Sequence, residues 1–316
     1  MIIASCAVAL SRCPVYEAEL LKEEVDRLCQ ASGFTASHGT AVLLKPNLVA
    51  AGRADGLALT HPQIVRAVAE WCLDHGAVVS VGDSPAFGSG LAVMDSCGIS
   101  EALLGLPVTR VSFDRQKTIV TQGRIKLTVA AEAFECDRLV NLPKLKAHSQ
   151  LRLTMAVKNY FGVVVAWRKA MAHMRHGNGD GRFIGLLVDL LAELPEGISL
   201  MDGVLAMHRT GPMDGQPVQV GVLAASRNPV ALDVAMMEVL GVDPALSPLG
   251  QECRRRGLPG SKGEDLEYPL LRPADVAVPG FVVPDVLDPI RFEAGRFVRG
   301  SIRRVLQRFF KAGIFR

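Results

Sequence analysis

The sequence of 316 residues lacks acidic side chains over one long internal stretch. Between Asp137 and Asp180 there is no Asp or Glu, whereas the same stretch contains eight Lys and Arg residues. The formal net charge of the whole chain is only +3, so the remainder of the chain is comparatively rich in acids. A local excess of positive charge of this kind favours contact with an anionic partner.

Four other features are scarce or missing. The 7 cysteines are scattered without any CxxC pair, which argues against a disulfide framework or a zinc site and favours reduced thiols in the cytoplasm. The apolar start MIIASCAVAL lacks a basic segment, so we interpret it as a strand rather than a signal peptide. No apolar run reaches the length of a membrane-spanning helix. Aromatic residues make up 5%, and no nucleic-acid-binding motif occurs, so a nucleic-acid partner is not expected.

Apolar periodicity predicts alternating strands and helices. Continuous apolar runs predict strands over 2–10, 41–44, 77–81, 138–142, 198–201 and 218–225, and a β-hairpin over 118–129. Amphipathic spacing predicts helices over 18–28, 62–76 and 181–194, the second with a capping box from Thr60 to Gln63. Asn228 is expected to cap a further helix, with Pro229 in its first position. The prediction is an α/β fold with a mostly parallel sheet and helices on both faces.

Two domains are expected. Residues 1–290 form the α/β domain, whose end from Pro244 to Pro289 is rich in proline and predicts an irregular wrap. Residues 291–316 form a basic tail with eight Lys or Arg residues, one acid, and apolar residues at helical spacing. Such a helix either docks on an anionic membrane surface or a redox partner, or packs its apolar stripe onto the domain. We therefore expect a cytoplasmic protein that is peripheral to the membrane if the tail docks there.

Polar side chains follow the predicted strands. In open α/β sheets, ligands bind beyond the carboxyl ends of the strands, so a shared edge would suit an anion. Ordinary alternatives exist: Lys45 and Asn47 fit a turn, Asn228 fits a helix cap, and Asp233 one turn later fits the helix dipole. The lysine cluster is harder to explain in this way, because nothing in the local sequence neutralises it. The polar residues that follow strands are Lys45, Asn47, Asp83, Ser84, Asn141, Lys144, Lys146, His148, Asp202 and Asn228.

The motifs VLLKPNLV, VVSVGDSP, NLPKLKAH, AVKNYFG, LMDGVLAMHRTGPMDG and NPVALDVAMMEVLG occur in this order. Together they resemble the family called domain of unknown function 362, over roughly residues 1–285. Many members carry a ferredoxin-like segment with clustered cysteines, which gives weight to redox chemistry. This sequence has no such cysteine run, so no built-in iron–sulfur cluster is expected. The family motifs also include Lys158, Asn159, Gly162 and Asp233.

Two hypotheses about function follow. In the first, an enzyme binds an anionic small molecule through its lysines, and Lys144, His148 or Lys158 acts as base or nucleophile. Asp83 and Asp202 are the candidate ligands for a divalent metal that bridges to the anion. In the second hypothesis, the same edge binds a cofactor or metabolite without chemistry. The expected ligand-binding residues are Lys45, Asn47, Ser84, Asn141, Lys146, Asn159, Gly162 and Asn228.

Overall fold

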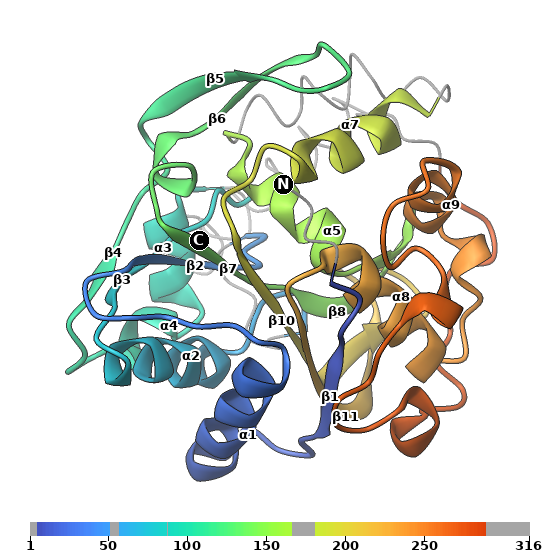
Figure 1. Ribbon diagram of the computed structural model, residues 1–316, viewed down its shortest axis with the longest axis horizontal. Coiled ribbons are helices and arrows are strands. Elements are labelled where there is room, and N and C mark those ends of the chain that lie inside the picture. The colour runs from blue at the N-terminus through green and yellow to red at the C-terminus, as the bar shows by residue number, and fades with distance from the viewer. Residues whose placement is uncertain (1–4, 51–56, 87, 166–180, 289–316) are drawn as a thin grey trace, which may run out of the picture.

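The computed structural model describes residues 5–50, 57–86, 88–165 and 181–288, and the tail over 291–316 lies outside these ranges. Its centre is a sheet in which the strands follow the order β1-β11-β10-β7-β2-β3-β4 (Figure 1). A branch, β8 and β9, pairs with β10 through β8. The bounds are β1 (Ala9–Arg12), β2 (Ala41–Pro46), β3 (Val78–Val81), β4 (Val108–Arg110), β7 (Arg138–Leu142), β8 (Lys144–His148), β9 (Arg152–Thr154), β10 (Gly197–His208) and β11 (Gln216–Ser226).

The middle of the sheet is parallel, and one edge is antiparallel. Strands β10, β7, β2, β3 and β4 pair in parallel, as does β8 with β10. Strand β11 runs antiparallel to β10 and β1. The predicted α/β class with a mostly parallel sheet is therefore confirmed. The predicted 218–225 strand is antiparallel to its neighbours, because β10 and β11 follow each other directly and form a long hairpin.

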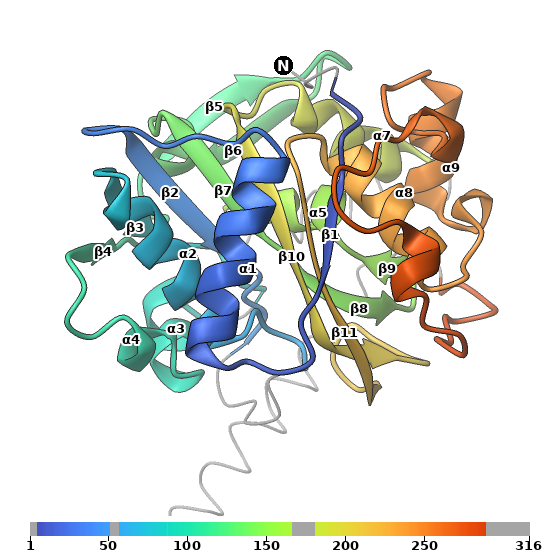
Figure 2. The same cartoon turned by 60° about the horizontal axis from the view of Figure 1, so that its bottom comes forward.

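Helices cover both faces of the sheet (Figures 1 and 2). On one face lie α1 (Ala18–Ala31), α2 (Pro62–Asp74), α3 (Gly90–Ser96) and α4 (Ile99–Ala102), packed on Val42, Leu44, Val140 and Leu142. The other face carries α5 (Ala156–Asn159), α7 (Arg182–Leu191), α8 (Pro229–Val239) and α9 (Pro248–Arg255). Leu43 and Leu139 point to that side. Alternation along β2 and β7 therefore assigns each side chain to one face.

Local details both confirm and correct the sequence predictions. The hairpin forms from β5 (Gln116–Val120) and β6 (Lys126–Ala130), and Asn228 caps α8 as expected. The capping box at Thr60 is wrong, because His61 is the N-cap of α2 and its side chain accepts the hydrogen bond from Gln63 N. The Pro-rich segment also contains a regular helix, α9. The described residues also include short 3₁₀ turns: η1 (Ala131–Ala133), η2 (Tyr160–Val163), η3 (Pro244–Leu246), η4 (Gly263–Asp265) and η5 (Pro273–Val276).

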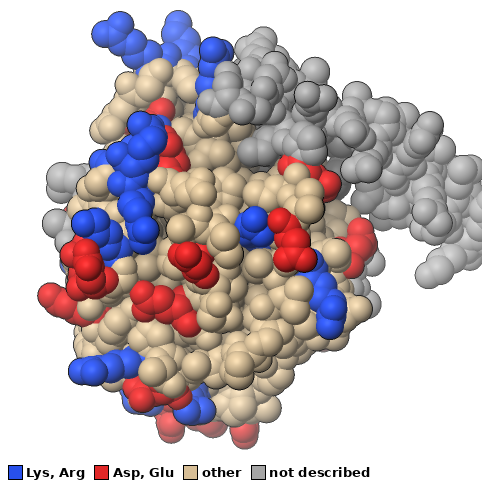
Figure 3. Space-filling model, turned by 90° about the vertical axis from the view of Figure 1, so that its right-hand side faces the viewer, with Lys and Arg blue, Asp and Glu red and all other residues tan. Residues whose placement is uncertain are grey.

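The face of the molecule that includes α8 and α9 carries Lys and Arg side chains interspersed with Asp and Glu (Figure 3). Within the described ranges, no helix is long and apolar enough to cross a membrane. Several lysines and aspartates are buried inside the protein at the carboxyl ends of the parallel strands.

Candidate functional site

Most of the polar residues at the carboxyl ends of the strands fall into two groups on opposite faces of the sheet. The α5-side group consists of Lys45, Asp83, Asn141, Lys158, Asn159 and Gly162. The α2-side group consists of Tyr16, Asn47, His61, Lys144, Lys146 and Asp202. Alternation explains the division: Lys45 lies two residues after Leu43 and Asn141 two residues after Leu139, on the side of α7. Lys144 instead contacts Tyr16, which precedes α1.

The core of the α5-side group is a buried ion pair. Lys45 Nζ lies 2.8 Å from Asp83 Oδ1, and the two side chains are 0% and 2% exposed. Asp83 Oδ2 also accepts a hydrogen bond from Leu48 N at 2.9 Å. Burial lowers the pKa of Lys45, while the charge of Asp83 opposes that shift. The acid that neutralises Lys45 thus comes from the loop after β3, far away in the sequence.

Gly162, which belongs to η2, lies against this ion pair. A Cβ atom at this position would lie 2.2 Å from Asp83 Oδ1 and 2.3 Å from Lys45 Nζ. Any side chain there would push the pair apart, because real Cβ contacts are essentially never that short. The glycine of the AVKNYFG motif is therefore required by close approach of the backbone to buried charges.

Lys158 is the unpaired cation of the α5-side group. No hydrogen bond or ion pair joins its ammonium to any residue in the described part of the chain, and it lies 5.0 Å from the centre of the Phe161 ring. The side chain is half-buried. Loss of water and, next, the positive charge of Lys45 lower the pKa of Lys158 to about 8, with Asp83 opposing the shift. This ammonium is therefore both costly to keep charged and available to a ligand.

The asparagines of this group bind each other and the backbone. Asn159 Nδ2 donates to Asn141 Oδ1 at 2.8 Å, and Asn141 Nδ2 donates to Ser199 Oγ at 3.0 Å and to Ala156 O at 3.2 Å. Buried amides with several hydrogen bonds fix the geometry around them. They tie α5 to the end of β7 and the start of β10, so the position of Lys158 depends on this network.

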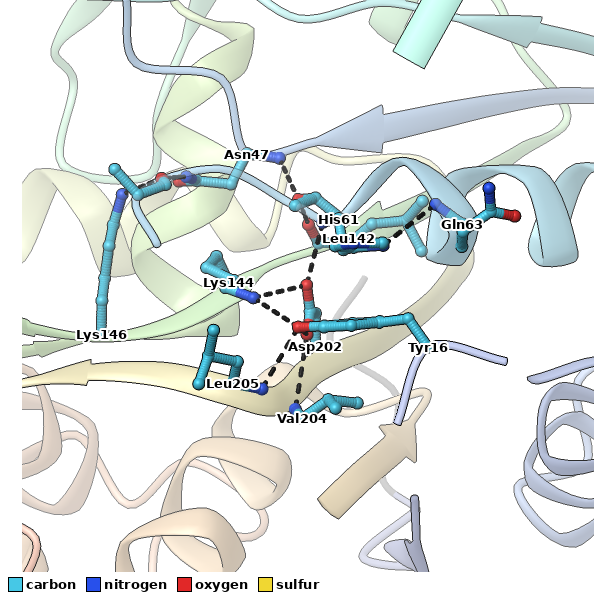
Figure 4. A network of polar contacts seen from close by, with 12 residues as sticks. Tyr16, Asn47, His61, Gln63, Leu142, Lys144, Lys146, Asp202, Val204 and Leu205 are labelled. Carbon is cyan, nitrogen blue, oxygen red and sulfur yellow. Dashed lines mark hydrogen bonds and ion pairs between the residues drawn. The ribbon is translucent and has the colours of Figure 1, made fainter. Parts of the chain in front are cut away.

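The α2-side group is centred on Asp202 (Figure 4). Lys144 Nζ lies 2.8 Å from Asp202 Oδ2, with exposures of 1% and 0%. The Tyr16 hydroxyl donates to Asp202 Oδ1 at 2.8 Å and accepts from Lys144 Nζ at 2.8 Å. His61 N donates to Asp202 Oδ2 at 2.9 Å. The charges of Lys144 and Asp202 are therefore matched by close partners.

Sequence reasoning missed Tyr16 and His61. Their rings stack with centroids 3.6 Å apart and an interplanar angle of 7°. His61 Nδ1 accepts from Gln63 N at 3.2 Å, so the proton of the neutral ring is on Nε2. Burial and the nearby Lys144 lower the pKa of His61, against the effect of Asp202. The predicted capping box from Thr60 to Gln63 indicated a helix start beside His61, but no local pattern pointed to Tyr16.

Lys146 and Asn47 hold the loop that leads into α2. Both donate to Ala58 O, Lys146 through Nζ at 2.7 Å and Asn47 through Nδ2 at 2.6 Å. The Thr60 hydroxyl donates to Leu142 O at 2.6 Å and accepts from Asn47 N at 2.8 Å. This loop also links the two groups, because Leu48 N reaches Asp83 and His61 N reaches Asp202.

The remaining predicted residues lie at the margins or elsewhere. Ser84 is buried directly after Asp83. His148 is buried at the far end of β8, where its Nδ1 accepts from Gln150 N at 3.1 Å. Asn228 follows the antiparallel strand β11, just beyond Ser226, which pairs with Ser199 near the start of β10, and its side chain caps α8.

The two carboxylates predicted as metal ligands are each paired with a lysine, in different groups. Among the described residues, no group of three or more His, Cys, Asp or Glu side chains is placed to hold a metal ion. The seven cysteines are free thiols, and burial raises the pKa of Cys72 and Cys253 to about 12. Neither set of residues offers a ready metal centre within the described ranges.

Comparisons with known proteins agree with the motifs. The chain is 36% identical over 309 residues to a thylakoid-associated protein of Synechocystis sp., covering 96% of each chain. Among solved structures, it is similar to the lactate racemase apoprotein of Thermoanaerobacterium thermosaccharolyticum, with a TM-score of 0.46 and 10% identity. That match covers 73% of this chain and 57% of the racemase chain. A Thermotoga maritima protein matches with a TM-score of 0.40 and 12% identity, over 62% of this chain and 52% of that one. The model of the domain of unknown function 362 matches residues 42–238, and the chain therefore belongs to that family.

Proposed function

We propose that this protein is an enzyme that binds an anionic small molecule on the α5 side of the sheet, with Lys158 as the residue that meets it. The observation that carries this proposal is the half-buried ammonium of Lys158, which has no hydrogen-bond or ion-pair partner among the described residues. A protein keeps an unpaired cation in such surroundings at a cost in stability, so a ligand that neutralises it gives the residue a purpose.

The neighbours of Lys158 support a ligand of negative charge. Lys45 and Asp83 neutralise each other, which leaves the charge of Lys158 as the net charge of the three. A carboxylate or phosphate group placed beside Lys158 would form a charge-assisted hydrogen bond in a poorly hydrated place, where such bonds are strong.

The pKa of about 8 supports a chemical role beyond binding. At pH 7, roughly a tenth of such lysines carry a neutral amine, compared with less than about a thousandth for an ordinary lysine. A neutral amine next to a bound anion can act as a general base, or as a nucleophile toward a carbonyl carbon. We therefore favour a substrate that carries both a carboxylate or phosphate group and a removable proton or carbonyl.

The proposal is tested by ligand-induced stabilisation of the full-length protein. Inorganic phosphate, citrate and pyruvate serve as probes, and melting temperatures are compared for wild type, Lys158→Met and Lys158→Arg. We expect at least one probe to stabilise the wild type, Lys158→Arg to retain part of the effect, and Lys158→Met to lose it. Lys117→Met, which removes an exposed lysine on β5, is the matched control. Stabilisation that persists in Lys158→Met would refute the proposal.

A second candidate function is attachment to a membrane surface. The relative from Synechocystis sp. is described as thylakoid-associated, and the basic residues of 291–316 would favour an anionic lipid surface. Sedimentation with anionic and neutral vesicles tests this function. Replacement of Arg303, Arg304 and Arg308 by Glu should abolish co-sedimentation with anionic vesicles. Equal sedimentation of wild type and the triple variant would remove this candidate.

A further inference from the structure

We infer that Asp233, on α8, is the positioning residue for Lys158: its carboxylate caps α5 and thereby sets where the lysine stands. This inference rests on the proposed function of Lys158 and names a residue that acts on the same site from another helix. The hydrogen bonds of Asp233 go to the backbone of α5, so its effect on Lys158 passes through that backbone.

The geometry is that of a helix cap supplied from outside the helix. Asp233 Oδ1 accepts a hydrogen bond from Ala156 N at 2.7 Å, and Oδ2 accepts from Val157 N at 3.1 Å. The N-cap residue of α5 is Met155, whose side chain forms no capping hydrogen bond. The first N–H groups of a helix need acceptors, and here one carboxylate of α8 satisfies two of them.

The length of α5 makes this cap decisive. The helix comprises only Ala156–Asn159 before the chain tightens into η2. A single turn is not stable by itself, so its position follows from what holds its two ends. Asn159 holds one end through Asn141, and Asp233 holds the other end. Lys158 lies between these two attachments.

The chemical nature of Asp233 argues that this arrangement has a purpose. The carboxylate is half-buried and has no ion-pair partner among the described residues. A neutral side chain would cost less at such a place, but neither Asn nor Ser presents two acceptor oxygens at this spacing. In Asn, the amide NH₂ would face one of the two backbone N–H groups.

Asp233 is also a side chain of this region whose pKa lies near neutral pH. Burial raises the pKa of Asp233 to about 7, against the effect of its two backbone hydrogen bonds. The titratable side chains that its charge affects are Tyr160 of η2 and Cys253 of α9, and burial raises the pKa of each to about 12. Protonation of Asp233 would convert one acceptor oxygen into a donor, so the cap weakens below neutral pH.

The experiment measures the titration of Lys158 directly. Full-length protein is pulse-acetylated with acetic anhydride across the alkaline range, and the modified fraction of Lys158 is quantified by mass spectrometry. For the wild type we expect a midpoint at about 8. In Asp233→Asn, the loosened turn should hydrate Lys158 and move the midpoint upward. Labelling near pH 8 should then fall by about fivefold for the first pH unit by which the midpoint rises, and by about tenfold for each further unit. Phosphate should also protect Lys158 less in this variant.

Asp243→Asn is the matched control, because Asp243 caps η3 through Ala245 N and is exposed. It should leave the titration of Lys158 unchanged. If Asp233→Asn does not fold, Asp233→Glu replaces it, since the longer side chain keeps the charge but displaces the acceptors. A wild-type midpoint near 8 that is unchanged in the folded Asp233 variant overturns the inference and leaves the proposed function intact. A wild-type midpoint near the ordinary 10.5 overturns the proposed function itself.

Discussion

Lys144 and Lys158 come from the same acid-free stretch, yet their surroundings differ completely. Lys144 is 1% exposed and is bound to Asp202 and Tyr16 on the α2 side. Lys158 is half-buried on the α5 side and has no such partner in the described part of the chain. A local excess of charge therefore does not identify a binding site. What matters is whether acids from distant parts of the sequence reach each lysine.

The largest expected effect on stability comes from replacing Lys144, the lysine that is paired with Asp202. Lys144→Met leaves Asp202 buried without its cation, and removal of one partner of a buried pair costs about 3–5 kcal/mol of unfolding free energy. Urea denaturation at pH 7 measures this loss. The double variant Lys144→Met/Asp202→Asn should recover part of the stability, because no unpaired charge remains. If Lys144→Met unfolded at the same urea concentration as the wild type, the ion pair would be dispensable for stability.

Gly162→Ala should be the next most damaging change. Its Cβ would press on Asp83 Oδ1 and Lys45 Nζ, which cannot move without breaking their ion pair, so we expect a loss of about 1–3 kcal/mol. Gly185→Ala is the matched control, because Gly185 lies within α7 and the nearest atom to its Cβ would be the flexible end of Arg256. There, alanine favours the helix by up to about 1 kcal/mol. Equal effects at the two positions would contradict the close-approach argument.

The fold class and most elements could be predicted from the sequence, because apolar runs and helix caps are local signals. The position of Lys45 near the end of β2 was also readable, but Asp202 does not follow its strand as predicted: β10 continues to His208, and Lys144 begins β8. The ion pairs were not readable, since Asp83 and Asp202 meet their lysines only after the sheet has formed. The division into two faces needed the exact register of β7 and β8, and Tyr16 carried no pattern at all. Local sequence signals therefore indicated where the polar residues gather. Tertiary packing determined that Lys158 has no ion-pair partner in the described part of the chain.

Replacing Lys158 should change stability by a smaller amount and should increase it. Lys158→Met removes a cation that is costly below pH 8, so we expect a gain of about 1–2 kcal/mol at pH 7. Because the folded pKa is below the ordinary value, wild-type stability rises as pH increases from about 8 to 10.5, and the advantage of the variant should disappear over that range. Urea denaturation at pH 7 and pH 10 checks both points. Destabilisation at pH 7 would mean that Lys158 has a structural partner.

The smallest expected effect is the pH dependence that Asp233 contributes. Its folded pKa of about 7 lies above the usual 3.8, so the folded state holds a proton that the unfolded state has already released. Wild-type stability therefore falls relative to Asp233→Asn as pH rises from about 4 to 7 and then levels off. At pH 5, where Asp233 is protonated, the wild type and the variant each present one carbonyl acceptor to the two N–H groups of α5, so their stabilities should be similar.

At pH 8 the variant should be more stable than the wild type by on the order of 1 kcal/mol, since the wild type then carries its unpaired, half-buried charge. Urea denaturation of both proteins at pH 5 and pH 8 isolates Asp233, because all other groups titrate in both. A stability difference that stays constant between these pH values would mean that Asp233 is ionised throughout. Its two hydrogen bonds to α5 would then outweigh its burial, and the cap that places Lys158 would be equally firm at every pH in this range.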